Sequence, residues 1–430
     1  MQIRIIRVIR VLTKMIRANP FDSCHPCSYK IIYMFNTSFL NLKTYCESQN
    51  FAGWDPYDGL NSKVFQATPL KHWDLARLAW IQGFKRSPIN FRKLLLVTKE
   101  HNAKGIGLFL AGYCNIYKAQ QTTGKEEFGT QQELLEKIND LAELLISLQS
   151  KGYSGACWGY NFDWQARRLF LFPKNTPTVV ATTFAATALF HAYEITKNEN
   201  WLNIAISAAR FVLNDLNRTP KKQGFLFSYS PLEGNNTVYN ASLLGSKLLS
   251  YCYQYTKDET LKTAACESIL ACTNAQQPDG SWLYGELPVQ NWIDSFHTGY
   301  NLDALQTYQD LTGDTAFQEH IKKGFAFYIK NFFLDDGTPK YYHNKIFPID
   351  IHCPAQLFVT LNRLNKFKEH QQLAEKVMNW TIQNMQNKKG YFYYQLKKGI
   401  SSKISYMRWS NAFMFYAMSN WINTDKSEHE

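Results

Sequence analysis

The sequence predicts an all-α fold, an (α/α)6 toroid built from six helical hairpins, and two repeated patterns support this prediction. A short polar turn recurs at intervals of 60 and 56 residues, at 196–201, 256–261 and 312–317. A longer connection, in which glycine lies close to aromatic residues, recurs at intervals of 56, 57 and 53 residues, at Gly224, Gly280, Gly337 and Gly390. Because a fixed period of this length marks stacked supersecondary units, each unit is predicted to be an αα-hairpin of about 55 residues.

Apolar residues between these connections keep the 3.6-residue period of a helix, as Phe184, Leu189 and Tyr193 illustrate. The period predicts six inner helices, near 105–119, 177–195, 239–255, 297–311, 353–365 and 407–421. It predicts six outer helices, near 74–84, 131–149, 200–216, 259–274, 315–332 and 369–386. Six and six make a closed ring, and an open solenoid of hairpins is the competing architecture.

The net charge of +12, with a pI near 9.1, raises the question of a nucleic-acid or membrane partner. Part of this charge is local, because residues 1–17 hold five basic residues and no acid precedes residue 20. The five recur among Ile, Val, Leu and Met in the pattern of a basic amphipathic helix: Arg4, Arg7, Arg10, Lys14 and Arg17. We therefore predict peripheral membrane contact through residues 1–17 and no nucleic-acid partner, with a floppy extension as the alternative. The expected division is a leader, 1–33, and one toroid domain, 34–425.

Several patterns argue against other classes of protein. No uncharged apolar stretch of about 18 residues exists to span a membrane, and arginines interrupt every possible signal-peptide core. Nine dispersed cysteines form no disulfide framework, which fits a reducing compartment and predicts a cytoplasmic protein. Walker, GxGxxG and GxSxG motifs are absent, so no cofactor is expected. Zinc binding by Cys157, His352 and Cys353 is disfavoured because neighbouring helical residues diverge by about 100°; no metal is expected.

The predicted connectivity gathers possible site residues at one end of the ring. Short turns lead from inner to outer helices, whereas the long loops lead back and meet at the other end, where function is expected. Aromatic residues make up 15% of the chain, which suits either stacking on sugars or a large aromatic core.

The first long loop places Asp163 among aromatic residues, namely Trp158, Tyr160 and Trp164. Desolvation there could raise the pKa of the carboxyl and prepare it for acid catalysis, while the aromatic rings hold sugars. The alternative is that Asp163 pins the loop by accepting backbone N–H groups.

A later loop carries Trp282 and Tyr284 as further candidate sugar-binding residues, followed by Asp294, His297 and Tyr300. Asp294 could be catalytic or could cap the helix that follows. His297 and Tyr300 lie three residues apart and share a helix face, so they could act as a base and an acid on one substrate.

Two more segments complete the set of candidates. Asp350 could cap a helix or partner His352 as a catalytic pair. Arg408 beside Trp409 suits the carboxylate of a uronic acid, and a structural salt bridge is the alternative.

Six short strings resemble a family of six-hairpin-glycosidase-like proteins from bacterial exopolysaccharide and capsule biosynthesis loci. The similarity runs from about residue 70 to 422, and the strings begin at Arg86, Asn102, Gly159, Asn240, Asp294 and Tyr406. The resemblance implies polysaccharide metabolism and the toroid fold, but it carries no catalytic assignment.

Three functions follow from these observations. The first is an inverting glycoside hydrolase acting on a bacterial oligosaccharide or polysaccharide in a central funnel, with Asp163 as one carboxylate and Asp294 or Asp350 as the other. The second is a uronate lyase or C5-epimerase that uses His297 or Tyr300 with Arg408. The third is a non-catalytic glycan-binding partner of a membrane synthase.

Overall fold

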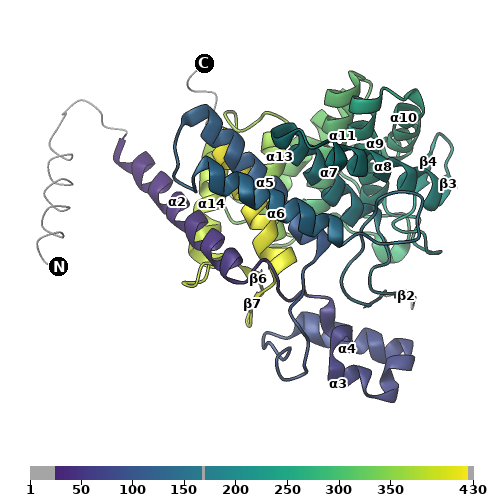
Figure 1. The fold of residues 1–430 in the computed structure, drawn as a ribbon, viewed down its shortest axis with the longest axis horizontal. Coiled ribbons are helices and arrows are strands. Elements are labelled where there is room, and N and C mark those ends of the chain that lie inside the picture. Colours follow the sequence, from purple (N-terminus) through teal and green to yellow (C-terminus); the bar gives the residue numbers. More distant parts are fainter. Residues whose placement is uncertain (1–24, 167–169, 425–430) are drawn as a thin grey trace, which may run out of the picture.

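Helices dominate the computed structural model, which describes residues 25–166 and 170–424 (Figure 1). The strands are short pieces within the connections: β1 (Trp164–Gln165), β2 (Leu171–Phe172), β3 (Arg218–Pro220), β4 (Phe225–Phe227), β5 (Ile349–Asp350), β6 (Tyr393–Leu396) and β7 (Ser402–Ser405). They form two antiparallel pairs and one three-stranded sheet. The predicted all-α class is therefore confirmed.

Six inner helices make a closed ring. They are α5 (Ala103–Thr123), α7 (Val179–Thr196), α9 (Tyr239–Thr256), α11 (Ser295–Thr312), α13 (His352–Arg363) and α15 (Phe413–Thr424), the last preceded by a π-helical segment, η5 (Met407–Ala412). Each inner helix packs against the next, and α15 packs against α5. All six predicted inner helices are confirmed, and the ring is closed rather than an open solenoid.

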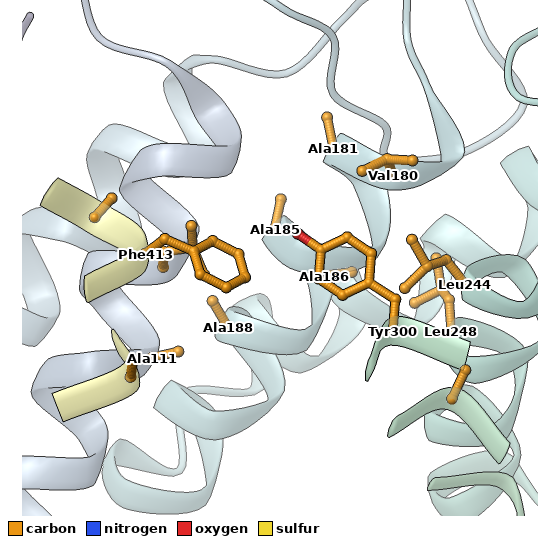
Figure 2. Packing of buried hydrophobic residues seen from close by; sticks show 14 of the residues in the cluster. Ala111, Val180, Ala181, Ala185, Ala186, Ala188, Leu244, Leu248, Tyr300 and Phe413 are labelled. Carbon is orange, nitrogen blue, oxygen red and sulfur yellow. The ribbon is translucent and has the colours of Figure 1, made fainter. Parts of the chain in front are cut away.

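Small side chains on α7 make room for larger ones at the centre of the ring. Ala185, Ala186 and Ala188 are buried on this helix. Tyr300 of α11 and Phe413 of α15 point toward one another across them (Figure 2), with ring centroids 6.1 Å apart. The centre is therefore filled by aromatic rings, consistent with the dense packing of protein interiors.

Within the described residues the outer layer also has six helices: α2 (His25–Ser48), α6 (Gln131–Ser147), α8 (Glu199–Arg210), α10 (Glu259–Thr273), α12 (Gln318–Phe332) and α14 (Gln371–Met385). A π-helical segment, η3 (Phe211–Asp215), extends α8. Five of these helices match the prediction.

The sixth outer helix is α2, so the predicted outer position near 74–84 is wrong. A helix does form there, α4 (Asp74–Arg86), but α2 packs against α14 and α15 and closes the outer layer. Gly390, with φ +99°, lies so close to α2 that a Cβ would come within 2.2 Å of the Asn41 carbonyl oxygen. At Gly224, with φ +73°, a Cβ would likewise come within 1.9 Å of the carbonyl oxygen of Glu267 in α10. Because glycine alone fits such contacts, these loops fix the spacing between neighbouring hairpins.

The short turns have a common geometry. Lys197, Lys257 and Gly313 follow α7, α9 and α11 with φ of 56°, 55° and 73°. The N–H of each bonds the carbonyl four residues earlier, a left-handed helix cap that ends the inner helix and reverses the chain. The repeated polar turns of the sequence are these caps.

The six long connections, here called the rim loops, are residues 49–102, 148–178, 211–238, 274–294, 333–351 and 386–406. Hydrogen bonds or bridges join each to its neighbours around the ring: Arg92 with Tyr406, Asn61 with Asn161, Tyr160 with Tyr229, Val238 with Gly285, Asp294 with Tyr342, and Ile349 with Leu396. The rim loops therefore lie at one end of the ring, as the connectivity predicts.

The first rim loop holds a small helical unit that projects from the ring (Figure 1). Its elements are η1 (Asp58–Asn61), α3 (Lys63–Gln66), η2 (Pro69–His72) and α4. Leu60, Phe65 and Ile81 form a separate small core. We call residues 53–100 the rim insertion.

Within the residues that the structure describes, none of the helices combines the length and the apolar character that crossing a bilayer requires. Residues 1–17, for which membrane contact is predicted, lie outside the described residues. The proposed boundary after residue 33 falls inside α2.

Candidate functional site

Predicted site residues meet where the inner helices begin, inside the circle of rim loops. We define the rim cluster as Lys104, His297, Tyr300, His352 and Trp409. Ring contacts link its members through Phe296: His297 lies 4.1 Å and His352 5.1 Å from that ring, measured between centroids. Trp409 lies 4.3 Å from His352. The distances place two histidines from different helices in contact with one phenylalanine ring.

Asp294 both caps α11 and orients His297. Its Oδ1 accepts the backbone N–H of His297 at 3.0 Å, and its Oδ2 accepts the Nδ1 proton of His297 at 2.7 Å. The indole of Trp292 also donates to Oδ2, at 2.9 Å. The carboxylate has no exposed surface, whereas the imidazole is 19% exposed. Because the carboxylate holds the proton on Nδ1, Nε2 is the basic nitrogen of His297.

His352 is a neutral imidazole at the floor of the cluster. Burial lowers its pKa well below the ordinary value, and the cations Lys104 and Arg408 lower it further. Its Nδ1 has no hydrogen-bond partner among the described residues and lies 3.9 Å from Asp350. A buried imidazole with an unpartnered nitrogen is chemically available.

Asp350 is fully engaged by donors. It accepts the indole N–H of Trp409 at 2.8 Å, the backbone N–H of His352 at 3.1 Å and the amide of Gln395 at 3.2 Å. Burial nevertheless raises the pKa of this carboxyl to about 6. It holds Trp409 and the start of α13 in place.

Lys104 is a buried cation at the base of the cluster. Its ammonium donates to the hydroxyl of Tyr300 at 3.1 Å and lies 4.3 Å from the ring centre of Phe184. Burial, aided by Arg408, lowers its pKa well below the ordinary value. Among the described residues it forms no ion pair, so its proton is unusually acidic for a lysine.

Arg408 forms a structural salt bridge, the alternative that the sequence left open. Its Nε and Nη2 donate to the two oxygens of Asp55 at 2.5 and 2.8 Å. Beside this pair, Arg92 binds Asp58 at 2.7 Å and the hydroxyl of Tyr406 at 3.0 Å. These buried groups attach the rim insertion to η5 through Arg408 and to the last rim loop through Tyr406.

Other predicted site residues surround the cluster. Tyr284 lies 4.6 Å from His297, and Tyr160 lies 5.0 Å from the Arg408 guanidinium. Trp164 is half-buried at the edge, beside Tyr57 of the rim insertion, which in turn contacts Trp409.

Two predicted sugar-binding residues belong to the core instead, which corrects that prediction. Trp158 has no exposed surface and donates its indole N–H to Leu145 at 2.8 Å. Trp282 is equally buried and bonds Cys272 at 3.0 Å. Each tryptophan pins a rim loop to the end of an outer helix, so neither presents a face on which a sugar could stack.

Asp163 has the loop-pinning contact that the sequence offered as its alternative role. It accepts the backbone N–H of Lys174 at 2.7 Å, across the β1–β2 hairpin. None of its hydrogen bonds in the described part of the chain reaches the rim cluster.

The axis of the ring beneath the rim cluster is nearly filled, unlike the central funnel that we expected. The cavity there has a volume of about 20 Å³, room for a single water molecule. It is lined in part by Lys247 and Asp303, which with Arg363 make a buried ionic group that we call the axial cluster. A ligand of the rim cluster must therefore approach from the rim.

Sequence reasoning missed Lys104, Asp55 and Tyr57. A single basic residue in the apolar run of α5 was the available signal for Lys104. Across the described ranges, no three His, Cys, Asp or Glu side chains gather as a metal site. Cys157 lies against the Ser150 carbonyl at 3.8 Å.

The chain is an (α/α)6 toroid in which titratable and aromatic side chains, the rim cluster, gather at one end of the ring. No family model matches the chain, and no curated protein does. Among solved structures, the chain is similar to cellobiose 2-epimerase from Bacillus thermoamylovorans, with 15% identity over 75% of this chain and 88% of that one, and a TM-score of 0.55.

Two further structures extend the likeness. A GH76 α-mannanase from Bacteroides thetaiotaomicron has 13% identity over 87% of this chain and 100% of its own, with a TM-score of 0.59. An unsaturated glucuronyl hydrolase specific for heparin has 12% identity over 92% and 98%, also with a TM-score of 0.59. At these identities the likeness establishes the toroid fold.

Proposed function

We propose that the protein is a carbohydrate-active enzyme that transfers protons on a sugar, an epimerase or isomerase of an oligosaccharide. The observation that carries this proposal is the pair of histidines, His297 and His352, that contact the same ring, Phe296. Epimerisation needs one group to remove a proton from carbon and another to return it on the opposite face. Two imidazoles from different helices suit that requirement.

In the proposed reaction, Nε2 of His297 takes the proton from the carbon next to the carbonyl of an open-chain sugar. The electron pair of the broken C–H bond forms a C=C bond, and the carbonyl oxygen becomes negative. In this proposal Lys104 and Tyr300, which are joined by a hydrogen bond, donate hydrogen bonds to that oxygen. The negative oxygen raises the proton affinity of His352, which is neutral in the free protein. His352 then takes up a proton from solvent and gives it to carbon on the other face, the carbonyl is restored, and His297 releases its proton to solvent.

The similar structures support a carbohydrate substrate. One is named as an epimerase, one as a mannanase, one as a glucuronyl hydrolase and another as a polysaccharide lyase. Their names span several reactions on sugars, so the choice of proton transfer rests on the two histidines of this chain.

Inverting hydrolysis is the second candidate, and the raised pKa of Asp350 favours it, since a general acid needs a carboxyl that keeps its proton. Such a reaction also requires a second carboxylate about 6.5–9.5 Å away. Asp294 is occupied by three donors and Asp163 by the loop backbone. Uronate chemistry through Arg408 is less favoured because Asp55 already neutralises that cation.

Product analysis tests the proposal. Reducing disaccharides and longer oligosaccharides are incubated with the protein and separated by chromatography. Proton transfer predicts a new sugar of unchanged mass and an unchanged number of reducing ends. Additional reducing ends would support hydrolysis, and a near-ultraviolet chromophore would support elimination; either result would refute the epimerase proposal.

A further inference from the structure

The rim insertion exposes an unusual concentration of large apolar side chains. Trp73, Leu75, Ile89 and Leu94 are 63%, 69%, 61% and 74% exposed. Others in the same unit are exposed to a lesser degree: Val64, Leu70, Phe91 and Leu96. Large apolar side chains exposed together within one small unit are typical of an interaction site.

Part of this surface is a groove. It has a volume of about 510 Å³ and lies between η2, α4 and the segment that follows α4. Apolar side chains dominate its lining, among them Phe65, Leu70, Trp80, Phe91 and Leu95. A ligand that fills this groove must therefore present an apolar surface to it.

Residues 62–99 of the rim insertion carry much of the excess positive charge of the protein, whereas Asp55, Asp58 and Glu100 near the ends of the insertion are acidic. Residues 62–99 contain eight Lys and Arg against one acid, Asp74, and residues 1–20 contain five against none. In the remainder of the chain, 34 basic residues balance 34 acidic ones, from totals of 47 and 35. Arg92 is buried against Asp58, and the other seven are exposed or partly exposed in the same segment: Lys63, Lys71, Arg77, Lys85, Arg86, Lys93 and Lys99.

Charge decides between possible occupants. The leader is basic, so it would be repelled by this surface, and a second copy would bring the same positive face. An occupant has to be negative and apolar at once. An anionic bilayer supplies both, with acidic headgroups for the lysines and acyl chains for the groove and for Trp73.

We propose that residues 62–99 form a docking surface for an anionic membrane, separate from the leader and independent of the reaction at the rim cluster. Lys93 and Lys99 lie at the headgroups, while Trp73, Leu75 and Leu94 enter the interface. The Asp55–Arg408 pair binds the rim insertion to η5, which contributes Trp409 to the rim cluster, so docking brings the rim cluster close to the bilayer.

Vesicle co-sedimentation of the full chain tests this proposal. Vesicles of phosphatidylcholine with phosphatidylglycerol are expected to bind the protein, vesicles of phosphatidylcholine alone are not, and salt weakens the binding. The double variant Trp73→Ser, Leu94→Ser keeps every charge and should reduce binding at least about tenfold. Val289→Ser, at a residue 63% exposed on another rim loop, is the matched control and should bind as the wild type does.

Several outcomes would overturn the proposal. Binding that survives the double variant but disappears when the five leader cations become glutamine assigns the membrane contact to the leader. A dimer in sedimentation velocity that the double variant converts to monomer assigns the surface to a second copy, and failure to bind anionic vesicles excludes the bilayer in favour of an acidic protein. Hydrogen exchange gives an independent readout: anionic vesicles should slow exchange within residues 63–97, and unchanged exchange there would count against docking even if the variants fold poorly.

Discussion

The inner helix α11 contributes to two buried charged groups that differ in one respect. In the axial cluster, the carboxylate of Asp303 forms salt bridges with Lys247 and Arg363. Arg363 also donates a hydrogen bond to the hydroxyl of Tyr251 at 3.0 Å. Burial would raise the pKa of Asp303, but its two cations outweigh this and hold it below the ordinary value. In the rim cluster, by contrast, the ammonium of Lys104 has only the hydroxyl of Tyr300 as its hydrogen-bond partner among the described residues.

The difference separates a structural group from a chemical one. Removing a charge from water is costly unless an opposite charge compensates, so paired groups hold a fold together. A buried lysine without an ion pair, beside a histidine with an unpartnered nitrogen, does not stabilise the fold in this way. Such perturbed groups mark candidate active sites.

The largest expected effect is on turnover. His297→Ala should reduce kcat about 10²- to 10⁴-fold because it removes the proposed base, and the melting temperature should change little since the imidazole is partly exposed. Asp294→Asn keeps the helix cap and should cause a smaller loss. Steady-state kinetics and thermal melting measure both, and normal turnover by His297→Ala would exclude it as the base.

The next comparison sets the two clusters against each other. Asp303→Asn leaves Lys247 and Arg363 as buried cations without their carboxylate, so we expect a loss of about 3–5 kcal/mol in the free energy of unfolding. Lys104→Met should leave stability unchanged or raise it, yet abolish turnover. Urea denaturation provides the measurement, and equal destabilisation by both variants would remove the distinction between the clusters.

A pH dependence is expected from Asp350. Its folded pKa, about 6, lies above that of an unfolded aspartic acid, so the stability it contributes is complete below about pH 4 and is lost as the pH rises through 6. Asp350→Asn cannot ionise; its stability relative to wild type should therefore increase by about 2–3 kcal/mol between pH 4 and 7. Burial also raises the pKa of Asp58 to about 6, but this group contributes equally to the pH dependence of the wild type and of the variant. A pH-independent difference in urea denaturation would contradict this.

Asp163 should give the smallest effect. Because its carboxylate accepts a backbone N–H, Asp163→Asn keeps an acceptor and should change stability by less than about 1 kcal/mol. Turnover should stay within a few-fold of wild type. Loss of turnover with intact binding would revive the hydrolase, in which Asp163 is a catalytic carboxylate.

Local patterns predicted the ring because the helices and turns of each hairpin are encoded within about 55 consecutive residues, by the helical period and by the residues of the turns. Local patterns could not predict that α2, and not α4, is the sixth outer helix, because both segments form helices. The choice depends on closure of the ring, where Gly390 packs closely against Asn41 of α2. The Asp55–Arg408 pair joins residues 353 apart. The sequence prediction that Trp158 and Trp282 bind sugars was wrong because a tryptophan next to glycine in a loop can be buried in the core as readily as exposed on the surface.

Deuterium incorporation tests the central claim most directly. The protein is incubated in D₂O with a sugar that it converts, and NMR follows the C–H groups next to the carbonyl. We predict that deuterium enters that carbon with the wild type and not with His297→Ala or Lys104→Met. Conversion of the sugar without any deuterium on carbon would contradict proton transfer at the rim cluster.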